Sequence, residues 1–296
     1  MFKIITFILA FLLIINAIEI YPVAIFHGAL QSCEDEQLSN LTYQLQTQLQ
    51  EKTEKQVYVK CIEYGPGMLT INRSMETQAK EACELLKQDE NLTGNISVLG
   101  MSQGAMIGRY IIQQCEFQGQ VKRYVGIGGP QMGGASCPGC FKGVACIPLN
   151  SFVSKYAYTE YAQENIGPAG CYHDAKNYDK YLDGNKFLPQ LNNLVNYQEQ
   201  YKKKIEDLEI MQLVQFLDDQ AVDPPSSAWF YFFDSNKKKV VPIQDQEIYK
   251  KNLIGLKSLN DNGLIEYVQL PGGHLEFDED DIYDYFVPAL AGEFQN

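Results

Sequence analysis

Asn95-Ile96-Ser97-Val98-Leu99-Gly100-Met101-Ser102-Gln103-Gly104-Ala105-Met106-Ile107 is the stretch around which the chain is organised. The apolar run Ile96–Leu99 indicates a buried strand that stops at Gly100, and a helical pattern follows. Between them lies a Gly-x-Ser-x-Gly motif centred on Ser102. A serine in such a sharp turn adopts a strained backbone conformation. Glycine two positions away on either side, here Gly100 and Gly104, removes the side chains that would clash.

The order strand, sharp turn, helix is the setting in which this motif forms the nucleophile elbow of an α/β-hydrolase. The helix after the turn points its positive end at the place where negative charge develops in acyl transfer. The alternative is a glycine-rich turn with a surface serine, because so short a motif also occurs by chance. The strand before it and the helix after it favour Ser102 as a nucleophile.

Length and composition suit one large α/β domain, or a domain with an insertion. The chain has 296 residues, a hydrophobic content of 45% and a net charge of −13. An acidic chain without a basic block is a poor binder of nucleic acid, so we expect no nucleic-acid partner.

The first 20 residues resemble a secretory signal, with Lys3 as the positive start and residues 4–15 as the apolar region. The alternative is an uncleaved signal anchor. The apolar run is short for a bilayer span of about 20 residues. We therefore expect cleavage, a mature chain over residues 21–296, no stable membrane span, and a lysosomal or secreted protein.

Eight cysteines fit an oxidising compartment. Cys137 and Cys140 have the C-x-x-C spacing of zinc or redox sites. However, no second such pair or paired histidines accompany them, and we expect no metal. Sequons begin at Asn40, Asn72 and Asn91, which are candidates for glycosylation, and at Asn95, which opens the predicted strand and would be inaccessible.

Strand-like and helix-like segments alternate along the chain, which indicates a mostly parallel sheet with helices on both faces. We predict strands over residues 23–26, 57–62, 96–99, 121–127, 211–217, 229–233 and 265–270. We predict helices over residues 36–52, 74–87 and 283–290, and one further helix that starts directly after the elbow. Ser74 is the expected N-cap of the second helix. Residues 131–206 contain no strong strand and many tyrosines, and we interpret them as an insertion of loops and short helices over the active site.

The serine needs a base, and the chain has only three histidines. In this fold the order along the chain is serine, acid, histidine. His27 precedes Ser102, and His173 leaves little room for an acid before it. His274 follows a predicted strand near the C-terminus and is the expected base.

The acid should follow a strand between Ser102 and His274. Asp218, Asp219 and Asp223 all follow the predicted strand over 211–217. We favour Asp223, because the prolines after it fix the backbone and suit a carboxylate held in one orientation. Asp218 and Asp219 are interpreted as polar residues that end the strand.

His27-Gly28 follows an apolar strand upstream of the elbow, where such folds place an oxyanion loop. The backbone amides of Ala29 and Gln103 are the expected donors. We expect His27 to organise this loop rather than to exchange protons.

From His27-Gly28 to the C-terminus, the chain resembles the lysosomal type of palmitoyl-protein thioesterase. The pieces that carry the resemblance are Gly100-Met101-Ser102-Gln103-Gly104, Cys137-Pro138-Gly139, Tyr172-His173-Asp174, the segment from Phe216-Leu217-Asp218-Asp219 through Val222-Asp223-Pro224 to Trp229-Phe230, and Gly273-His274-Leu275. Carried over, the resemblance implies a triad of Ser102, Asp223 and His274 and an oxyanion hole of the Ala29 and Gln103 amides. It also implies that the insertion forms the acyl-chain groove.

The resemblance further implies disulfides Cys83–Cys115 and Cys137–Cys146. This chain departs from the family at Cys61, Cys140 and Cys171, whose pairing does not transfer, at Cys33, which stands alone, and at Ala29, where the family usually has a larger residue.

The expected function is that of a monomeric serine hydrolase that cleaves long-chain acyl thioesters from cysteines of lipidated proteins and needs no cofactor. One alternative is an oxygen-ester lipase or acyl-CoA thioesterase on the same scaffold, which would differ only in its groove. A second is a non-enzymatic lipid-binding member, against which an intact triad counts.

Overall fold

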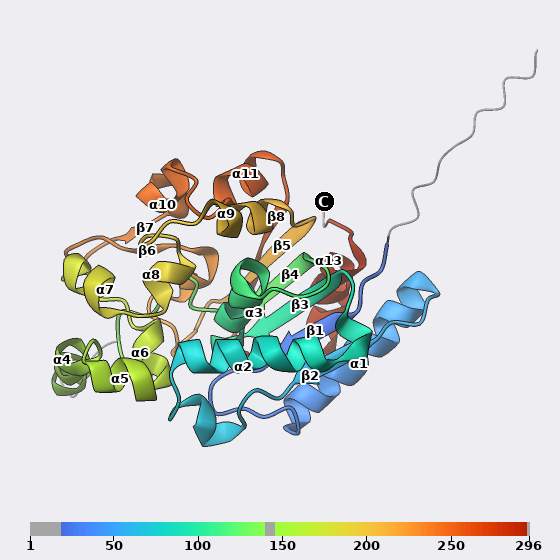
Figure 1. Ribbon diagram of the computed structural model, residues 1–296, viewed down its shortest axis with the longest axis horizontal. Coiled ribbons are helices and arrows are strands. Elements are labelled where there is room, and N and C mark those ends of the chain that lie inside the picture. Colours follow the sequence, from blue (N-terminus) through green and yellow to red (C-terminus); the bar gives the residue numbers. More distant parts are fainter. Residues whose placement is uncertain (1–18, 140–145, 295–296) are drawn as a thin grey trace, which may run out of the picture.

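The computed structural model describes residues 19–139 and 146–294 (Figure 1). Its centre is a six-stranded sheet in the order β2-β1-β3-β4-β5-β8, in which each pair of neighbours is parallel. The strands are β1 (Val23–Phe26), β2 (Val59–Ile62), β3 (Ile96–Met101), β4 (Val121–Ile127), β5 (Ile210–Phe216) and β8 (Ile265–Leu270). The predicted α/β fold is confirmed. The predicted signal segment falls almost entirely outside the described residues.

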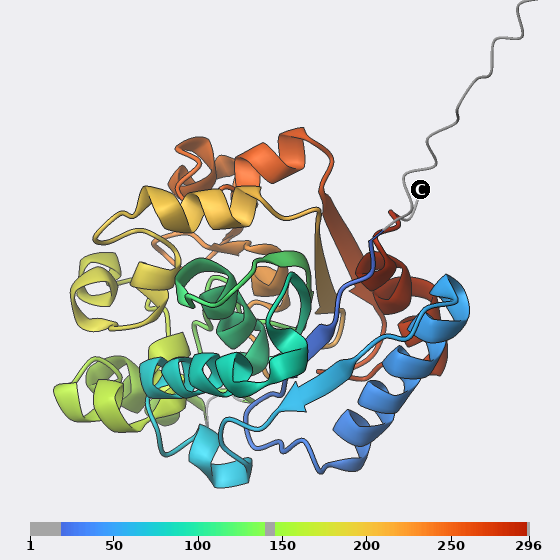
Figure 2. The same cartoon turned by 45° about the vertical axis from the view of Figure 1, so that its right-hand side comes forward.

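Helices cover both faces of the sheet (Figures 1 and 2). On one face lie α1 (Glu36–Thr53) and α13 (Val287–Ala291), and on the other α2 (Met75–Gln88) and α3 (Gln103–Gln114). The leucines that repeat along α1 at helical spacing are buried against the sheet: Leu38, Leu41, Leu45 and Leu49. Ser74 caps α2 as expected, because its side chain accepts a hydrogen bond from the Thr77 amide. None of the helices in the described ranges is long and apolar enough to cross a membrane.

The described part of the segment between β4 and β5 consists of loops and short helices. Its described helices are α4 (Cys146–Tyr156), α5 (Glu160–Asn165), α6 (Gly167–Cys171), α7 (Tyr178–Gly184), α8 (Leu188–Leu191) and α9 (Glu199–Glu206). The segment starts directly after the carboxyl end of β4, at the sheet edge where Ser102 follows β3. The insertion therefore begins beside the elbow.

The strand predicted over 229–233 is largely wrong. Residues Pro225–Trp229 form a 3₁₀ helix, η3, and only Phe232–Phe233 pair as β6 with β7 (Val240–Val241). Two adjacent prolines favour the 3₁₀ turn, and Phe230 then adopts a left-handed conformation with φ 62°. The predicted C-terminal helix is present, but it is built from α12 (Glu279–Asp281), the π-helical η5 (Ile282–Phe286) and α13. The remaining short elements are η1 (Gly67–Thr70), η2 (Glu90–Leu92), η4 (Ile243–Asp245), α10 (Glu247–Lys250) and α11 (Leu256–Asp261).

Two disulfides link described cysteines, and one of them is as expected. Cys83 in α2 is bonded to Cys115 at the end of α3. Cys33 is bonded to Cys61 in β2, a pair that the sequence did not reveal. The predicted disulfide between Cys137 and Cys146 is wrong, because Cys137 is a free thiol and Cys146 is disulfide-bonded to another cysteine. Cys171 is also free, and Cys140 lies outside the described residues.

Removing the Cys83–Cys115 bond is expected to lower the free energy of unfolding by about 3–4 kcal/mol, because the bond closes a long loop in the unfolded chain. Denaturant unfolding of the C83A/C115A double variant measures this loss. Cys171→Ala is the matched control, since it removes a cysteine that forms no cross-link. A double variant as stable as the control would contradict the prediction.

Candidate active site

Ser102 occupies the sharp turn between β3 and α3. Its backbone angles are φ 50° and ψ −119°, and its amide donates to the Ile127 carbonyl at 2.8 Å. A methyl group on Gly100 would lie 2.5 Å from the Ala105 Cα, and one on Gly104 would lie 2.1 Å from the Phe26 carbonyl oxygen. The steric reason for both glycines is therefore as predicted: neither position has room for a side chain.

A continuous chain of hydrogen bonds connects Ser102 to a carboxylate. The Ser102 Oγ lies 2.8 Å from Nε2 of His274, and Nδ1 of His274 lies 2.7 Å from Oδ2 of Asp219. The three residues follow the carboxyl ends of β3, β8 and β5, which meet at one edge of the parallel sheet. The Asp219 side chain is 1% exposed and that of His274 is 17% exposed, so the pair is shielded but still open toward substrate.

The Asp219 carboxylate is held on both sides. Its Oδ1 accepts hydrogen bonds from the backbone amides of Ala221, at 2.7 Å, and Val222, at 3.0 Å. Only Oδ2 is left for His274. Backbone donors of this kind fix the orientation of the carboxylate.

The prediction that Asp223 is the acid beside His274 is wrong. Its Oδ2 pairs with the Ser136 hydroxyl and lies 3.0 Å from Nζ of Lys237. The carboxylate therefore ties the insertion to the turn after β6, and Asp219 takes the place against His274. The chain does not leave the sheet directly after β5, because the Asp218 amide donates to the Gly272 carbonyl at 2.9 Å and keeps this segment beside the loop that carries His274.

The predicted oxyanion donors lie next to the serine. Gly28 passes so close that a methyl group on it would lie 3.1 Å from the Ser102 Cβ. Among the described residues, the amides of Ala29 and Gln103 donate to no protein acceptor. Two free amides on either side of a nucleophile are what an oxyanion hole requires. Their role remains a prediction.

The other two histidines are buried and held in place. The His27 ring lies 2.9 Å from Oε1 of Glu63 and stacks on Tyr64, which fits the expected role as a loop organiser. His173 stacks against Tyr181 and Phe232, each with its ring centroid at 3.9 Å. Burial lowers the pKa of His173 to about 4, so its ring is neutral near pH 5 and above. His173 belongs to the core of the insertion.

His27, Cys33 and Glu63 bring three metal-ligating atoms together, but the Cys33 sulfur is bonded to Cys61. In this arrangement the thiolate that a metal would need is not available.

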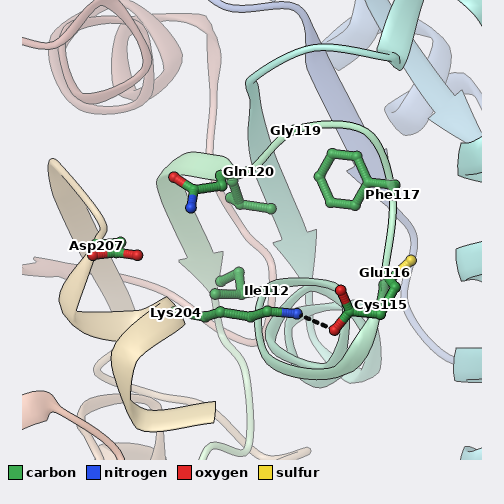
Figure 3. A pocket seen from close by; sticks show the side chains of 9 residues that line it. Ile112, Cys115, Glu116, Phe117, Gly119, Gln120, Lys204 and Asp207 are labelled. Carbon is green, nitrogen blue, oxygen red and sulfur yellow. Dashed lines mark hydrogen bonds and ion pairs between the residues drawn. The ribbon is translucent and has the colours of Figure 1, made fainter. Parts of the chain in front are cut away.

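The structure has a cavity of about 160 Å³, and Figure 3 shows the side chains that line it. It is lined by residues such as Cys115, Phe117 and Lys204, and it lies where β4 begins, at Val121. The triad follows strand ends at the opposite edge of the sheet. This cavity is therefore not the substrate site.

The candidate glycosylation sites Asn40, Asn72 and Asn91 are all exposed, whereas Asn95 is partly buried at the start of β3. Their exposure is compatible with modification, and the modification itself remains a prediction.

Comparisons with known proteins give the family to which the chain belongs. The sequence model of the family described as palmitoyl protein thioesterase matches residues 22–274. Palmitoyl-protein thioesterase 1 of Caenorhabditis elegans is 28% identical over 268 residues, which cover 88% of this chain and 88% of that protein. Lysosomal thioesterase PPT2-B of Xenopus laevis is 26% identical over 267 residues, again covering 88% of each chain. Among solved structures, a ferulic acid esterase covers 93% of this chain and 85% of its own with 11% identity and a TM-score of 0.47. With a family match over most of its length, this chain belongs to the palmitoyl protein thioesterase family.

Proposed function

We propose that this protein is a serine hydrolase that cleaves long-chain acyl thioesters from cysteines of lipidated proteins. The observation that carries the proposal is the hydrogen-bond chain from Asp219 through His274 to Ser102, at 2.7 Å and 2.8 Å. A serine alone is a weak nucleophile, and this arrangement supplies the base and the group that orients it.

In the proposed reaction, the Ser102 oxygen attacks the thioester carbonyl carbon while Nε2 of His274 takes the serine proton. Asp219 accepts a hydrogen bond from the Nδ1–H of His274, which keeps Nε2 free to act as the base and stabilises the imidazolium that forms. The carbonyl oxygen becomes an oxyanion between the Ala29 and Gln103 amides. Loss of one such donor costs about 10²–10³ in rate.

The tetrahedral intermediate then collapses, and the carbon–sulfur bond breaks. A thiol leaves as thiolate more readily than an alcohol leaves as alkoxide, so protonation of the leaving group matters less than in an oxygen ester. Water, activated by His274, attacks the acyl-enzyme and releases the fatty acid and Ser102.

The proposed substrate is supported by the family and by the insertion. The relatives named above are called palmitoyl-protein thioesterase and lysosomal thioesterase. The insertion presents exposed apolar side chains, among them Ile147 at 63% and Phe152 at 61% exposed, on α4. We infer that the insertion holds the acyl chain, and that the protein is a monomer of the secretory pathway, delivered to the lysosome or secreted. The Cys33–Cys61 and Cys83–Cys115 disulfides fit an oxidising compartment.

The rate constant kcat/KM is expected to rise about tenfold for every two carbons as the acyl chain of a thioester lengthens, because each buried methylene contributes about 0.8 kcal/mol. The rise should flatten when the acyl site is full. The measurement uses thioesters and matched oxygen esters with acyl chains of about 6 to 16 carbons, each kept below its critical micelle concentration. Over this range the burial of methylene groups is the main difference in binding free energy between substrates.

A flat chain-length profile would remove the long-chain assignment and leave the serine-hydrolase assignment standing. Oxygen esters turned over as fast as thioesters would favour a lipase. An absence of turnover together with an absence of fluorophosphonate labelling at Ser102 would favour a lipid-binding protein.

A further inference from the structure

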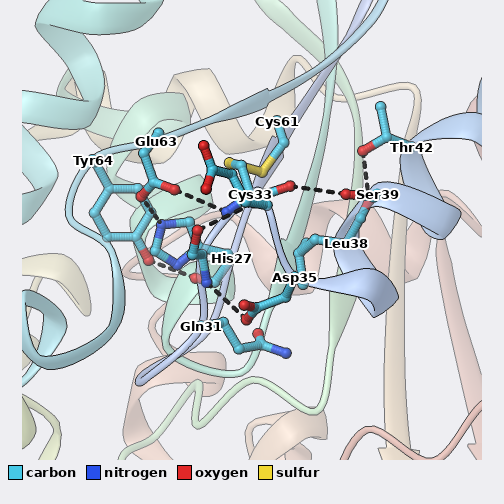
Figure 4. The surroundings of a disulfide bond; sticks show 12 residues. His27, Gln31, Cys33, Asp35, Leu38, Ser39, Thr42, Cys61, Glu63 and Tyr64 are labelled. Atoms are coloured by element: carbon cyan, nitrogen blue, oxygen red, sulfur yellow. Dashed lines mark hydrogen bonds and ion pairs between the residues drawn. A yellow bond between two sulfur atoms is a disulfide. The ribbon is translucent and has the colours of Figure 1, made fainter.

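A partly buried cluster of side chains around His27, at the start of the oxyanion loop, has no part in the chemistry described so far (Figure 4). The His27 side chain is fully buried, and its Nε2 donates to Oε1 of Glu63 at 2.9 Å. The ring stacks on Tyr64 with centroids 4.3 Å apart and an angle of 3° between the planes. The Tyr64 hydroxyl donates to the His27 carbonyl oxygen, so both the ring and the backbone of His27 are fixed.

Glu63 is the centre of this cluster. Its Oε2 accepts from the Cys33 amide at 2.8 Å, and its Oε1 accepts from the Gly65 amide at 3.3 Å as well as from His27. The Cys33–Cys61 disulfide fastens the same segment to β2, two residues before Glu63. One carboxylate therefore joins the end of β1, the turn at Cys33 and the loop after β2.

The Glu63 carboxylate is ionised in mildly acidic conditions. Partial burial alone would raise the pKa of this carboxyl, but the hydrogen bond from the Cys33 amide and the proximity of His27 outweigh it and hold the pKa below its usual value. The hydrogen bonds that depend on the charge are thus complete above the ordinary pKa of a glutamate and weaken only as the pH falls through the lowered one.

The loop held by this cluster has one unsatisfied amide. The Gly28 amide donates to Oε1 of Gln31 at 2.7 Å, and the Leu30 amide donates to Oγ1 of Thr70 at 2.7 Å. Between them, the Ala29 amide has no acceptor among the described residues. Every neighbouring donor is bound, so this single N–H is the one that the loop presents to a ligand beside Ser102.

We propose that Glu63 is a positioning residue for catalysis, which holds the oxyanion loop through His27 and thereby places the Ala29 amide against the developing oxyanion. This inference rests on the proposed function. Glu63 contacts neither the substrate nor Ser102. It acts through His27 on the backbone of the oxyanion loop, which starts at His27. The effect expected from its loss is therefore on the transition state rather than on binding of the acyl chain.

The test compares Glu63→Gln with the wild-type chain. A glutamine removes the negative charge, and its NH₂ group cannot accept from the Cys33 amide or from the Gly65 amide, whichever of the two it faces. At least one of these backbone hydrogen bonds is therefore lost, and the bond between residue 63 and His27 is no longer made to a carboxylate. We expect kcat for a long-chain acyl thioester to fall by about 10–100-fold, a fraction of the effect of losing an oxyanion donor. KM should change by less than about threefold, since the lost interaction is made only in the transition state.

A second readout isolates the oxyanion. A long-chain trifluoromethyl ketone adds Ser102 to its carbonyl carbon and forms a tetrahedral oxyanion, whereas the matching trifluoromethyl carbinol does not. Affinity of Glu63→Gln for the ketone should fall by the same factor as kcat, and affinity for the carbinol should be unchanged. A general loss of structure would lower both affinities.

Glu209→Gln is the matched control. The Glu209 carboxylate also joins distant segments, since it accepts from the Tyr21 hydroxyl at 2.8 Å and from Nε of Arg123 at 3.1 Å. It lies directly before β5, at the sheet edge opposite Ser102. This variant should lose stability and keep its affinity for the ketone.

A folded Glu63→Gln variant with wild-type affinity for the ketone overturns the role of Glu63. If that variant does not fold, His27→Phe decides the question, because it keeps a ring against Tyr64 and removes the hydrogen bond to Glu63 together with the contact of Nδ1 with the Gly28 carbonyl oxygen. Unchanged ketone affinity in that variant overturns the role equally. Wild-type protein that does not bind the ketone overturns the proposed function and this role with it.

Discussion

Replacing Asp219 with asparagine is expected to lower kcat for acyl thioesters by about 10⁴ while the fold stays intact. The geometry explains why so small a change is so costly. The amides of Ala221 and Val222 both donate to Oδ1 of Asp219, so the asparagine oxygen will occupy that position. Its NH₂ group then faces Nδ1 of His274. That ring must accept at Nδ1 and carry its proton on Nε2, which is the tautomer that cannot take a proton from Ser102.

Asp223→Asn is the matched control for this prediction, since the same substitution is made four residues further along the chain. Asp223 contacts Ser136 and Lys237 and does not contact His274. We expect a change in kcat of less than about tenfold and a loss of about 1–3 kcal/mol in the free energy of unfolding, from a hydrogen-bonded charge. Steady-state kinetics and denaturant unfolding on both variants make the comparison. A loss of activity in Asp223→Asn as large as in Asp219→Asn would contradict the assignment of the acid.

The choice between these two carboxylates shows where sequence reasoning reached its limit. The prolines after Asp223 do restrict the local backbone, but local rigidity does not say which side chain meets His274. That depends on the Leu217 and Asp218 amides, which donate to the carbonyls of Leu270 and Gly272 and carry the chain beside β8 beyond the end of β5. Pairing of segments about 50 residues apart leaves no local signal in one sequence. The available signal was position: an acid directly after a strand end.

Residues whose role depends on local geometry were predictable. Gly100 and Gly104 flank a serine at a strand–helix junction, and the steric requirement follows from that junction alone. His274 was found because the chain contains only three histidines and the order along the chain excludes two. The sheet followed from alternating patterns, whereas 229–233 was misassigned because an aromatic run does not distinguish a strand from a packed 3₁₀ turn.

Residues whose role depends on the assembled fold were not predictable. The Cys33–Cys61 bond requires the turn after β1 to lie over β2, and Glu63 gains its role only when that turn supplies the Cys33 amide. Cys137, assigned to Cys146 by resemblance, is a free thiol. Spacing along a chain does not determine which cysteines come within bonding distance.

The elbow leads to the largest expected loss of activity. Replacing Ser102 with glycine or alanine should lower kcat by about 10⁶, since removal of the nucleophile costs about as much as removal of the whole triad. The two variants should nevertheless differ in stability. Ser102 has φ 50° and ψ −119°, a conformation that glycine adopts freely and that costs other residues about 1–3 kcal/mol.

Ser102→Ala keeps that strain and Ser102→Gly releases it. Glycine also lowers the free energy of unfolding by about 0.5–1 kcal/mol, because it makes the unfolded chain more flexible. After this loss is subtracted from the released strain, the glycine variant should be more stable than the alanine variant by about 1 kcal/mol. Denaturant unfolding of the two inactive proteins measures the difference without interference from turnover. A glycine variant equal to or less stable than the alanine variant would mean that the turn is not strained. Greater stability of the glycine variant would show that the fold holds Ser102 in an unfavourable backbone conformation. The turn that presents the Ser102 hydroxyl to the acyl carbon would then lower the stability of the protein.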